Sequence, residues 1–131
     1  MADQAAPAER FFKTAWFSKV AKKAHISDDE LYAAIRQVML GQADDLGGGV
    51  FKKRLSKNMY RSIILAKGGH YWVYEYLFAK KDRDNIDPVE LNDFRKLAKA
   101  YATLTEQQIN QLTQERTGLR FAIESANGAW Q

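Results

Sequence analysis

Three strand-like segments separated by short turns occupy the middle of this chain, and they limit the folds open to it. The segments are Val50–Leu55, Tyr60–Lys67 and His70–Lys80, and they are rich in β-branched and aromatic residues. The sequence Lys67-Gly68-Gly69-His70 between the last two is typical of a hairpin turn. A hairpin joins antiparallel neighbours, so the middle of the chain predicts an antiparallel sheet.

Helix signals flank these strands on both sides. Ser27-Asp28-Asp29-Glu30 is a capping box, in which the Ser hydroxyl and the Glu carboxylate satisfy free amides at a helix start. Asp87-Pro88-Val89-Glu90 predicts a second helix start with Pro at the first helical position, and Thr105-Glu106-Gln107-Gln108 predicts a third. Near the N-terminus, the aromatic segment 11–17 predicts a first strand, followed by a short helix over 18–24.

Together these patterns predict an α+β domain. We expect a small, mainly antiparallel sheet of three or four strands, with N-terminal helices packed on one face and a C-terminal helical pair. The 131 residues suit one domain, and 46% hydrophobic with 27% charged residues excludes disorder for most of the chain. We assign residues 1–9 to a flexible extension, 10–116 to the domain and 117–131 to a C-terminal tail.

Several classes of site and location are disfavoured by what the sequence lacks. Without cysteine the chain has neither disulfides nor thiolate metal sites, and no Asp, Glu or His cluster has metal-ligand spacing, so we expect no metal and no cofactor. No apolar run approaches the roughly 18 residues needed to span a membrane, and residues 1–10 lack the apolar core of a signal peptide. We therefore expect a cytoplasmic protein with no membrane partner. The triple glycine 47–49 predicts a turn rather than a phosphate-binding loop, because no Gly-Lys-Ser/Thr follows it.

Charge is concentrated in the predicted sheet. Nine of the 20 Lys and Arg residues lie between Lys52 and Arg83, against two acidic residues, so this stretch carries +7. The remaining residues carry eleven basic and fourteen acidic groups, or −3. A single lysine there is explained by protection of a strand edge. Nine basic groups held together destabilise a fold unless a partner compensates, which favours a polyanion such as RNA or DNA.

The expected strand pairing gathers these cations. Lys52 and Arg54 project to one face of their strand, and Arg61 opens the next strand near the point where Arg54 closes the first. On the third strand we expect Trp72, Tyr74, Tyr76 and Phe78 to share the core-facing side. The other side would then offer Tyr71 as a ring for base stacking, with Lys53 and Lys57 as further RNA-binding residues.

Three motifs in order resemble the RelE/HigB-type toxins of bacterial toxin–antitoxin systems, in the RelE/ParE superfamily. They are Gly47-Gly48-Gly49-Val50-Phe51-Lys52-Lys53-Arg54-Leu55, Tyr60-Arg61-Ser62-Ile63-Ile64-Leu65 and Phe78-Ala79-Lys80-Lys81-Asp82-Arg83-Asp84-Asn85-Ile86. The resemblance runs from about residue 11 to residue 112. It implies a RelE-like fold, an endoribonuclease (mRNA interferase) that works on the ribosome, and neutralisation by an antitoxin, often of helix-turn-helix type.

The resemblance also implies site residues. Its cationic cluster would fall on Lys52, Arg54, Arg61, Lys80, Lys81 and Arg83. Such a site can cleave RNA without metal if a base takes the ribose 2′-OH proton, cations stabilise the phosphorane and an acid protonates the 5′-oxygen. Some RelE toxins place a Tyr after the last motif, where this chain has Ile86-Asp87. The proton-transfer residue therefore stays open among Lys52, Tyr60 and Asp84.

Two other functions fit the same sequence. A ParE-like toxin would share the fold and act on DNA gyrase without cleaving RNA. A non-catalytic RNA-binding or interaction module would use the same charge for binding alone. The resemblance favours a toxin that inhibits translation, with the ribosome, mRNA and an antitoxin as partners.

Overall fold

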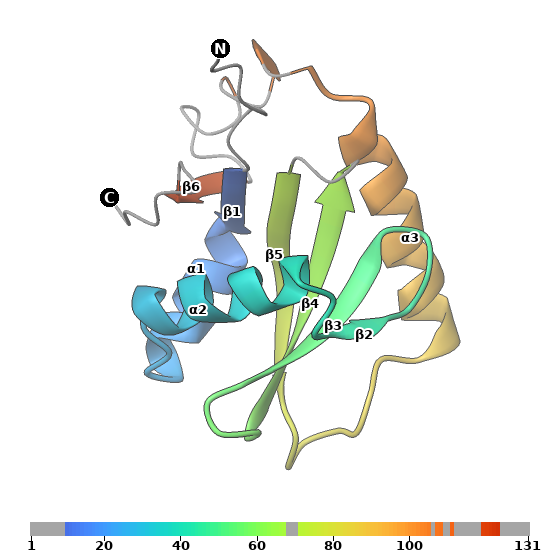
Figure 1. Cartoon of the computed structure of the whole chain (residues 1–131). Helices are drawn as coiled ribbons and strands as arrows, with labels where there is room; N and C mark the ends of the chain where they lie inside the picture. Colours follow the sequence, from blue (N-terminus) through green and yellow to red (C-terminus); the bar gives the residue numbers. More distant parts are fainter. Residues whose placement is uncertain (1–9, 68–70, 106, 109–110, 112–118, 124–131) are drawn as a thin grey trace.

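The computed structural model describes residues 10–67, 71–105, 107, 108, 111 and 119–123. Within them, one mixed sheet is covered by helices on both faces (Figure 1). The elements follow in the order β1 (Arg10–Thr14), α1 (Ala15–Lys23), α2 (Asp28–Met39), β2 (Asp44–Asp45), β3 (Val50–Leu55), β4 (Tyr60–Lys67), β5 (Tyr71–Ala79), α3 (Pro88–Ala102) and β6 (Leu119–Ile123). No helix in the described part of the chain combines the length and the apolar character needed to cross a membrane.

The antiparallel meander β3-β4-β5 is present as predicted, but the sheet is larger than three or four strands. Its order is β2-β3-β4-β5-β1-β6, and β1 runs parallel to β5 while the other pairings are antiparallel. The additional strands are β2, which has only two residues, and β6, which lies in the predicted tail. The strand β2 is too short to show a pattern, whereas β6 has apolar residues at alternate positions, Leu119, Phe121 and Ile123, and was assigned to the tail.

The first strand ends three residues earlier than predicted. Thr14 caps α1 because its hydroxyl accepts a hydrogen bond from the Phe17 amide at 3.0 Å, so Trp16 and Phe17 belong to the helix. The other helix starts agree with the sequence: Ser27 caps α2, and Asp87 with Glu90 forms a full capping box on α3. The Thr105 box is also formed, and most of the helix predicted after it lies outside the described residues.

A hydrophobic core lies on each face of the sheet. On one face, α1 and α2 contribute Phe17, Leu31 and Ile35 to a buried cluster with Ile64 and other strand residues. On the opposite face, α3 covers a second cluster that includes Val50, Ile63 and Leu65 of the strands. We refer to these as the α1/α2 face and the α3 face. N-terminal helices on one face agree with the prediction.

A β-bulge in β5 overturns the predicted parity of its aromatic residues. Ile63 pairs with Tyr76 while Ile64 pairs with Tyr74, so Glu75 is an extra residue in the ladder. As a result Trp72 and Tyr74 face α1 and α2, whereas Tyr76 and Phe78 face α3. Uninterrupted alternation along the strand predicts all four rings on one side, so that prediction is wrong for Tyr76 and Phe78. The bulge lets β5 supply aromatic side chains to both cores.

Side-chain bonds fix α3 to the sheet at both ends. Near its start, Arg83 forms a two-pronged ion pair with Glu90. Near its end, the Tyr101 hydroxyl donates to a carboxylate oxygen of Glu75 at 3.0 Å. Burial raises the pKa of Glu75, and the Tyr101 hydrogen bond partly offsets this. In the middle, Arg95 donates to the Leu46 and Gly47 carbonyls, which holds the glycine turn against the helix.

Candidate nucleic-acid interface

The predicted cations of the first two motif strands lie on one face of the sheet. Lys52 and Arg54 share the face of Val50, and Arg61 shares the face of Ile63, which is the α3 face in both cases. Arg54 and Arg61 are direct cross-strand partners. Like charges directly opposite each other destabilise a sheet. In the part of the chain that the structure describes, neither arginine forms an ion pair, so an external anion would relieve this repulsion.

Arg61 is held rather than free in solvent. It is 9% exposed, and its guanidinium Nη1 donates to the Asn58 carbonyl at 2.9 Å and to the Tyr60 carbonyl at 3.3 Å. Asn58 lies in the turn that joins β3 to β4, where Ser56, Lys57 and Asn58 all have positive φ. Arg61 therefore fixes one side of a strained turn while keeping its charge on the α3 face.

Lys52 connects the site to two neighbouring segments. Its ammonium donates to the Asn85 side-chain oxygen at 3.3 Å and lies 3.8 Å from an Asp44 carboxylate oxygen. The side chain is only 16% exposed. Asn85 was not identified from the sequence, although it lies within the third motif, and it brings the loop before α3 next to β3. Lys52 is thus held at the edge of the cationic face by Asn85 and Asp44.

Arg83 is bound within the protein more strongly than the sequence suggested. Besides Glu90, it donates to the Asn85 carbonyl at 3.0 Å and to the Tyr76 hydroxyl at 3.5 Å, and it stacks over the Phe78 ring. Hydrogen bonding to Glu90 is the main reason that its pKa is raised, and the same bond lowers the pKa of Glu90. Sequence reasoning missed Glu90 as a partner because it also serves the capping box.

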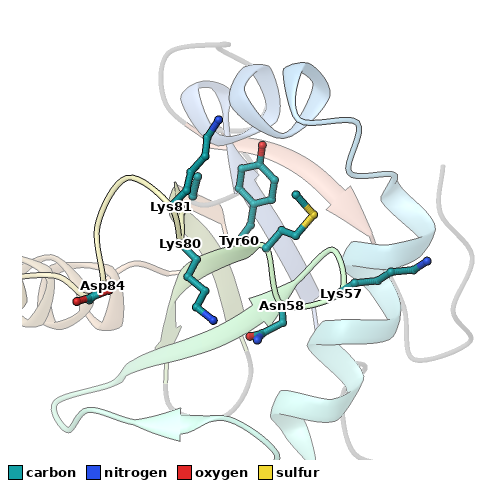
Figure 2. A pocket seen from close by; sticks show the side chains of 8 residues that line it. Lys57, Asn58, Tyr60, Lys80, Lys81 and Asp84 are labelled. Atoms are coloured by element: carbon teal, nitrogen blue, oxygen red, sulfur yellow. The ribbon is translucent and has the colours of Figure 1, made fainter.

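The other predicted site residues of the third motif, Lys80, Lys81 and Asp84, line a pocket of about 490 Å³ at the end of the sheet. Figure 2 shows Lys80 directed toward Asn58, whereas Tyr60 and Lys81 point to the other side of the strand ends. Tyr60 packs against the α1/α2 core, so it lies across the sheet from Arg61. The structure therefore divides the predicted catalytic set: Lys80 is directed to the Arg61 side and Lys81 is not.

Asp84 and Lys57 line the same pocket from opposite ends. Asp84 comes from the loop before α3, and its carboxylate points away from Tyr60 in Figure 2. Lys57 comes from the β3–β4 turn and is exposed. The two residues were predicted for proton transfer and RNA binding respectively, and the structure places both at the pocket.

Lys53 lies on the face of the sheet opposite the cations, and Tyr71 lies on their face but is covered by α3. Lys53 projects to the α1/α2 side, where its ammonium donates to the Gln42 carbonyl at 2.9 Å. Burial, followed by the charge of Arg54, lowers its pKa, and Asp44 partly offsets the effect. Tyr71 is only 7% exposed and packs against Phe12, because the side of β5 that was expected to be open is covered by α3. A stacking role for this ring does not agree with its buried position.

No cluster of three His, Cys, Asp or Glu residues that could hold a metal ion occurs among the residues described. The groups gathered here are instead ammonium, guanidinium, amide and phenol groups. Such groups bind phosphate oxygens by charge and hydrogen bonds. The fold and this face define a small α+β protein with a cationic sheet surface.

Comparison with known proteins identifies the family. A family model described as RelE toxin of RelE / RelB toxin-antitoxin system matches residues 9–119. The match covers most of the chain, which therefore belongs to the RelE toxin family. It is a toxin of a toxin–antitoxin system, and its family implies pairing with a cognate antitoxin. A search of curated proteins finds no match to this chain.

Proposed function

We propose that this toxin inhibits translation by cleaving mRNA on the ribosome, through attack of a ribose 2′-OH on the adjacent phosphate. The observation that carries the proposal is the facing pair Arg54 and Arg61 on the α3 face. Two guanidinium groups held together suit the phosphorane, whose charge grows as the reaction proceeds. Family membership supports the same conclusion.

The proposed roles follow from position. Arg61 has little freedom because of its bonds to the β3–β4 turn, and such preorganisation favours charge stabilisation over loose binding. Arg54 is exposed and contacts the same phosphate from the neighbouring strand. Arg83 orients the loop before α3, and its charge is already compensated by Glu90.

The position of each group decides the proposed proton transfers, both for the three candidates Lys52, Tyr60 and Asp84 and for Lys80 of the cationic cluster. Lys52 lies on the same face as Arg54 and Arg61, so we propose that it is the base that accepts the 2′-OH proton. Lys80 is directed toward Asn58, whose carbonyl accepts a hydrogen bond from Arg61, and it supplies a proton to the departing 5′-oxygen (Figure 2). Tyr60 lies across the sheet and Asp84 points away from Tyr60 at the pocket, so neither is given a role in this step.

The proposed partners are the ribosome with its mRNA, and an antitoxin of helix-turn-helix type. An acidic or amphipathic antitoxin segment would cover the α3 face cations, because exposed positive charge binds RNA without selectivity in a cell. The toxin would act in the cytoplasm, where ribosomes are found.

Pulse labelling of cells that express the toxin without antitoxin tests this proposal. Amino-acid incorporation should fall before thymidine incorporation, and expression of Arg54→Ala should leave both rates close to those of uninduced cells. Lys99→Ala, on the exposed side of α3, is the matched control and should remain toxic. If thymidine incorporation falls first, the toxin acts on DNA gyrase in the manner of ParE and the proposal is wrong.

A further inference from the structure

Glu30 occupies the third helical position of a predicted capping box, but its carboxylate binds a different part of the molecule. The Ser27 hydroxyl accepts a hydrogen bond from the Glu30 amide at 3.2 Å, as such a box requires. The Glu30 carboxylate instead accepts a hydrogen bond from the Ser56 amide in the β3–β4 turn, 26 residues further along the chain. Capping of α2 therefore does not explain why this carboxylate lies where it does.

The backbone that carries Glu30 is fixed by the core on the α1/α2 face. Its neighbour Leu31 is fully buried there. The Tyr74 hydroxyl of β5 donates to the Leu31 carbonyl at 2.6 Å, which anchors the first turn of α2 to the sheet. Glu30 itself is half-buried. A carboxylate on so firmly held a helix turn can hold a second segment in one position.

The segment that Glu30 binds is strained and leads to Arg61. Ser56, Lys57 and Asn58 have φ of 53°, 53° and 74°, in the left-handed region that non-glycine residues adopt at a cost. Glu30 holds the amide at the start of this stretch, and the Arg61 guanidinium donates to the carbonyl at its end at 2.9 Å. Because the strain favours relaxation to other conformations, the direction of the Asn58 carbonyl depends on both bonds.

We propose that Glu30 is a positioning residue for Arg61. Its carboxylate fixes the β3–β4 turn, so that the Asn58 carbonyl holds the Arg61 guanidinium in the orientation that meets the phosphate. The proposal rests on the proposed function of Arg61. Glu30 acts from the helix that covers the α1/α2 face, whereas Arg61 serves the α3 face, so the effect passes through the turn. Charge alone gives the opposite expectation, because removal of a carboxylate raises the positive potential near Arg61.

Two substitutions at Glu30 separate the reach of the side chain from its charge. Glu30→Gln loses the charge but keeps an oxygen at the same reach, so it should cleave mRNA on programmed ribosomes at close to the wild-type rate. Glu30→Asp keeps the charge but is one methylene shorter, so its single-turnover cleavage should be roughly tenfold slower or more. Glu30→Ala should behave like Glu30→Asp. Equal rates for the Gln and Asp variants, or faster cleavage by Glu30→Ala, would overturn the proposal.

The matched control is Asp29→Ala, which removes a carboxylate from the same turn of α2 at an exposed position. It should cleave like wild type. Ribosome binding, measured by co-sedimentation, should be unchanged in all these variants, because Glu30 is not proposed to touch RNA. In an Arg61→Ala background, Glu30→Asp should slow cleavage no further, since the group that it positions is gone. A further loss of the same size there would show that Glu30 acts by another route and would contradict the proposal.

NMR of the arginine side chains in ¹⁵N-labelled toxin tests the positioning without ribosomes. A guanidinium held by the Asn58 and Tyr60 carbonyls rotates slowly about its Nε–Cζ bond and gives separate Nη signals, which are assigned by their loss in Arg61→Lys. The signals should be separate in wild type and Glu30→Gln and merged in Glu30→Asp and Glu30→Ala, while dispersed amide signals report that each variant is folded.

The two readouts distinguish failure of this proposal from failure of the proposed function. Separate Nη signals in Glu30→Asp and Glu30→Ala, or merged signals in wild type, would overturn the positioning role. If the NMR result is as expected but wild type does not cleave mRNA, Glu30 still positions Arg61 and only the proposed function fails.

Discussion

The two faces of the sheet are used differently. The α1/α2 face is largely apolar along the meander, from Leu55 at the end of β3 to Leu77 in β5, and the helices cover it; Lys53 and Ser62 are polar exceptions. The α3 face is apolar only where α3 lies, at Val50, Ile63 and Leu65, and it carries Arg54 and Arg61 beyond. Folding energy therefore comes from both faces, whereas the candidate chemistry lies on the part of one face that α3 leaves uncovered.

The largest expected effect is on the free energy of unfolding of the protein, through the core on the α1/α2 face. Phe17 is fully buried and stacks on Tyr74 with ring centroids 4.9 Å apart. Phe17→Ala should lower the free energy of unfolding by about 3–5 kcal/mol through lost burial and a cavity. Arg54→Ala, on the exposed side, should change it by less than about 0.5 kcal/mol. Urea denaturation of both variants checks the contrast, which fails if the two losses are similar.

The next largest effect concerns Arg61, because its guanidinium both binds the β3–β4 turn and carries positive charge on the α3 face. Arg61→Ala should slow mRNA cleavage by roughly 100-fold, as for loss of a transition-state donor. Arg61→Lys should stay impaired, because a single ammonium cannot replace the planar guanidinium that contacts both the turn and a phosphate. Single-turnover cleavage on programmed ribosomes measures both, with Lys99→Ala as control. Wild-type rates in Arg61→Ala would remove it from the site.

Antitoxin binding should also distinguish the two parts of the α3 face. Arg54→Glu should weaken the complex roughly tenfold, more at low salt than at high salt, since the antitoxin segment is proposed to be acidic there. Lys99→Glu reverses a charge on α3 itself and should have little effect. Calorimetric titration at two salt concentrations gives both values. Equal losses for the two variants would mean that the antitoxin does not discriminate the uncovered part of the face.

The smallest effect is the pH dependence of stability at the two ends of α3. Burial raises the pKa of Glu75 above its ordinary 4.5, so its stabilising contribution is present below that value and is lost as pH rises through the folded pKa. Arg83 lowers the pKa of Glu90, so that contribution is present above 4.5 and is lost as pH falls.

Replacing each glutamate with glutamine tests whether Glu75 and Glu90 change stability with pH in opposite directions. Relative to wild type, Glu75→Gln should gain stability as pH rises from about 4 to 7, and Glu90→Gln should lose it over the lower part of that range. Thermal unfolding across this range is the measurement. Slopes of the same sign would contradict the assignment of one buried and one ion-paired carboxylate.

Local patterns were enough to predict much of the fold. The helix starts at Ser27 and Asp87 and the β3-β4-β5 meander depend on neighbouring residues, and all are present. The box at Asp87 is complete, whereas at Ser27 only the hydroxyl caps the helix and the Glu30 carboxylate accepts the Ser56 amide instead. The strand β2 and the bulge at Glu75 depend on partners distant in sequence, which the sequence pattern did not reveal. The bulge then explains why Tyr76 and Phe78 were assigned to the wrong face.

For the candidate site, too, the positions of the strand residues were predictable and the contacts made by loops were not. Alternation along β3 put Lys52 and Arg54 on one face, and the expected pairing of β3 with β4 put Arg61 near Arg54, which is its cross-strand partner in the structure. These patterns could not show that Glu90 binds Arg83 or that Asn58 binds Arg61, because these contacts depend on loop geometry. Tyr71 is buried because α3 packs over it, and the packing position of α3 cannot be predicted from the sequence of β5.

The most direct test of the central claim is cleavage by Arg54→Ala, because Arg54 is exposed and its loss should leave the fold intact. On programmed ribosomes under single-turnover conditions, wild type should cleave mRNA and Arg54→Ala should be at least about 100-fold slower. Ribosome binding, measured by co-sedimentation, should fall only a few-fold, because the contact strengthens as the phosphorane forms. Equal cleavage rates, or no cleavage by wild type, would contradict a catalytic role for the uncovered part of the α3 face.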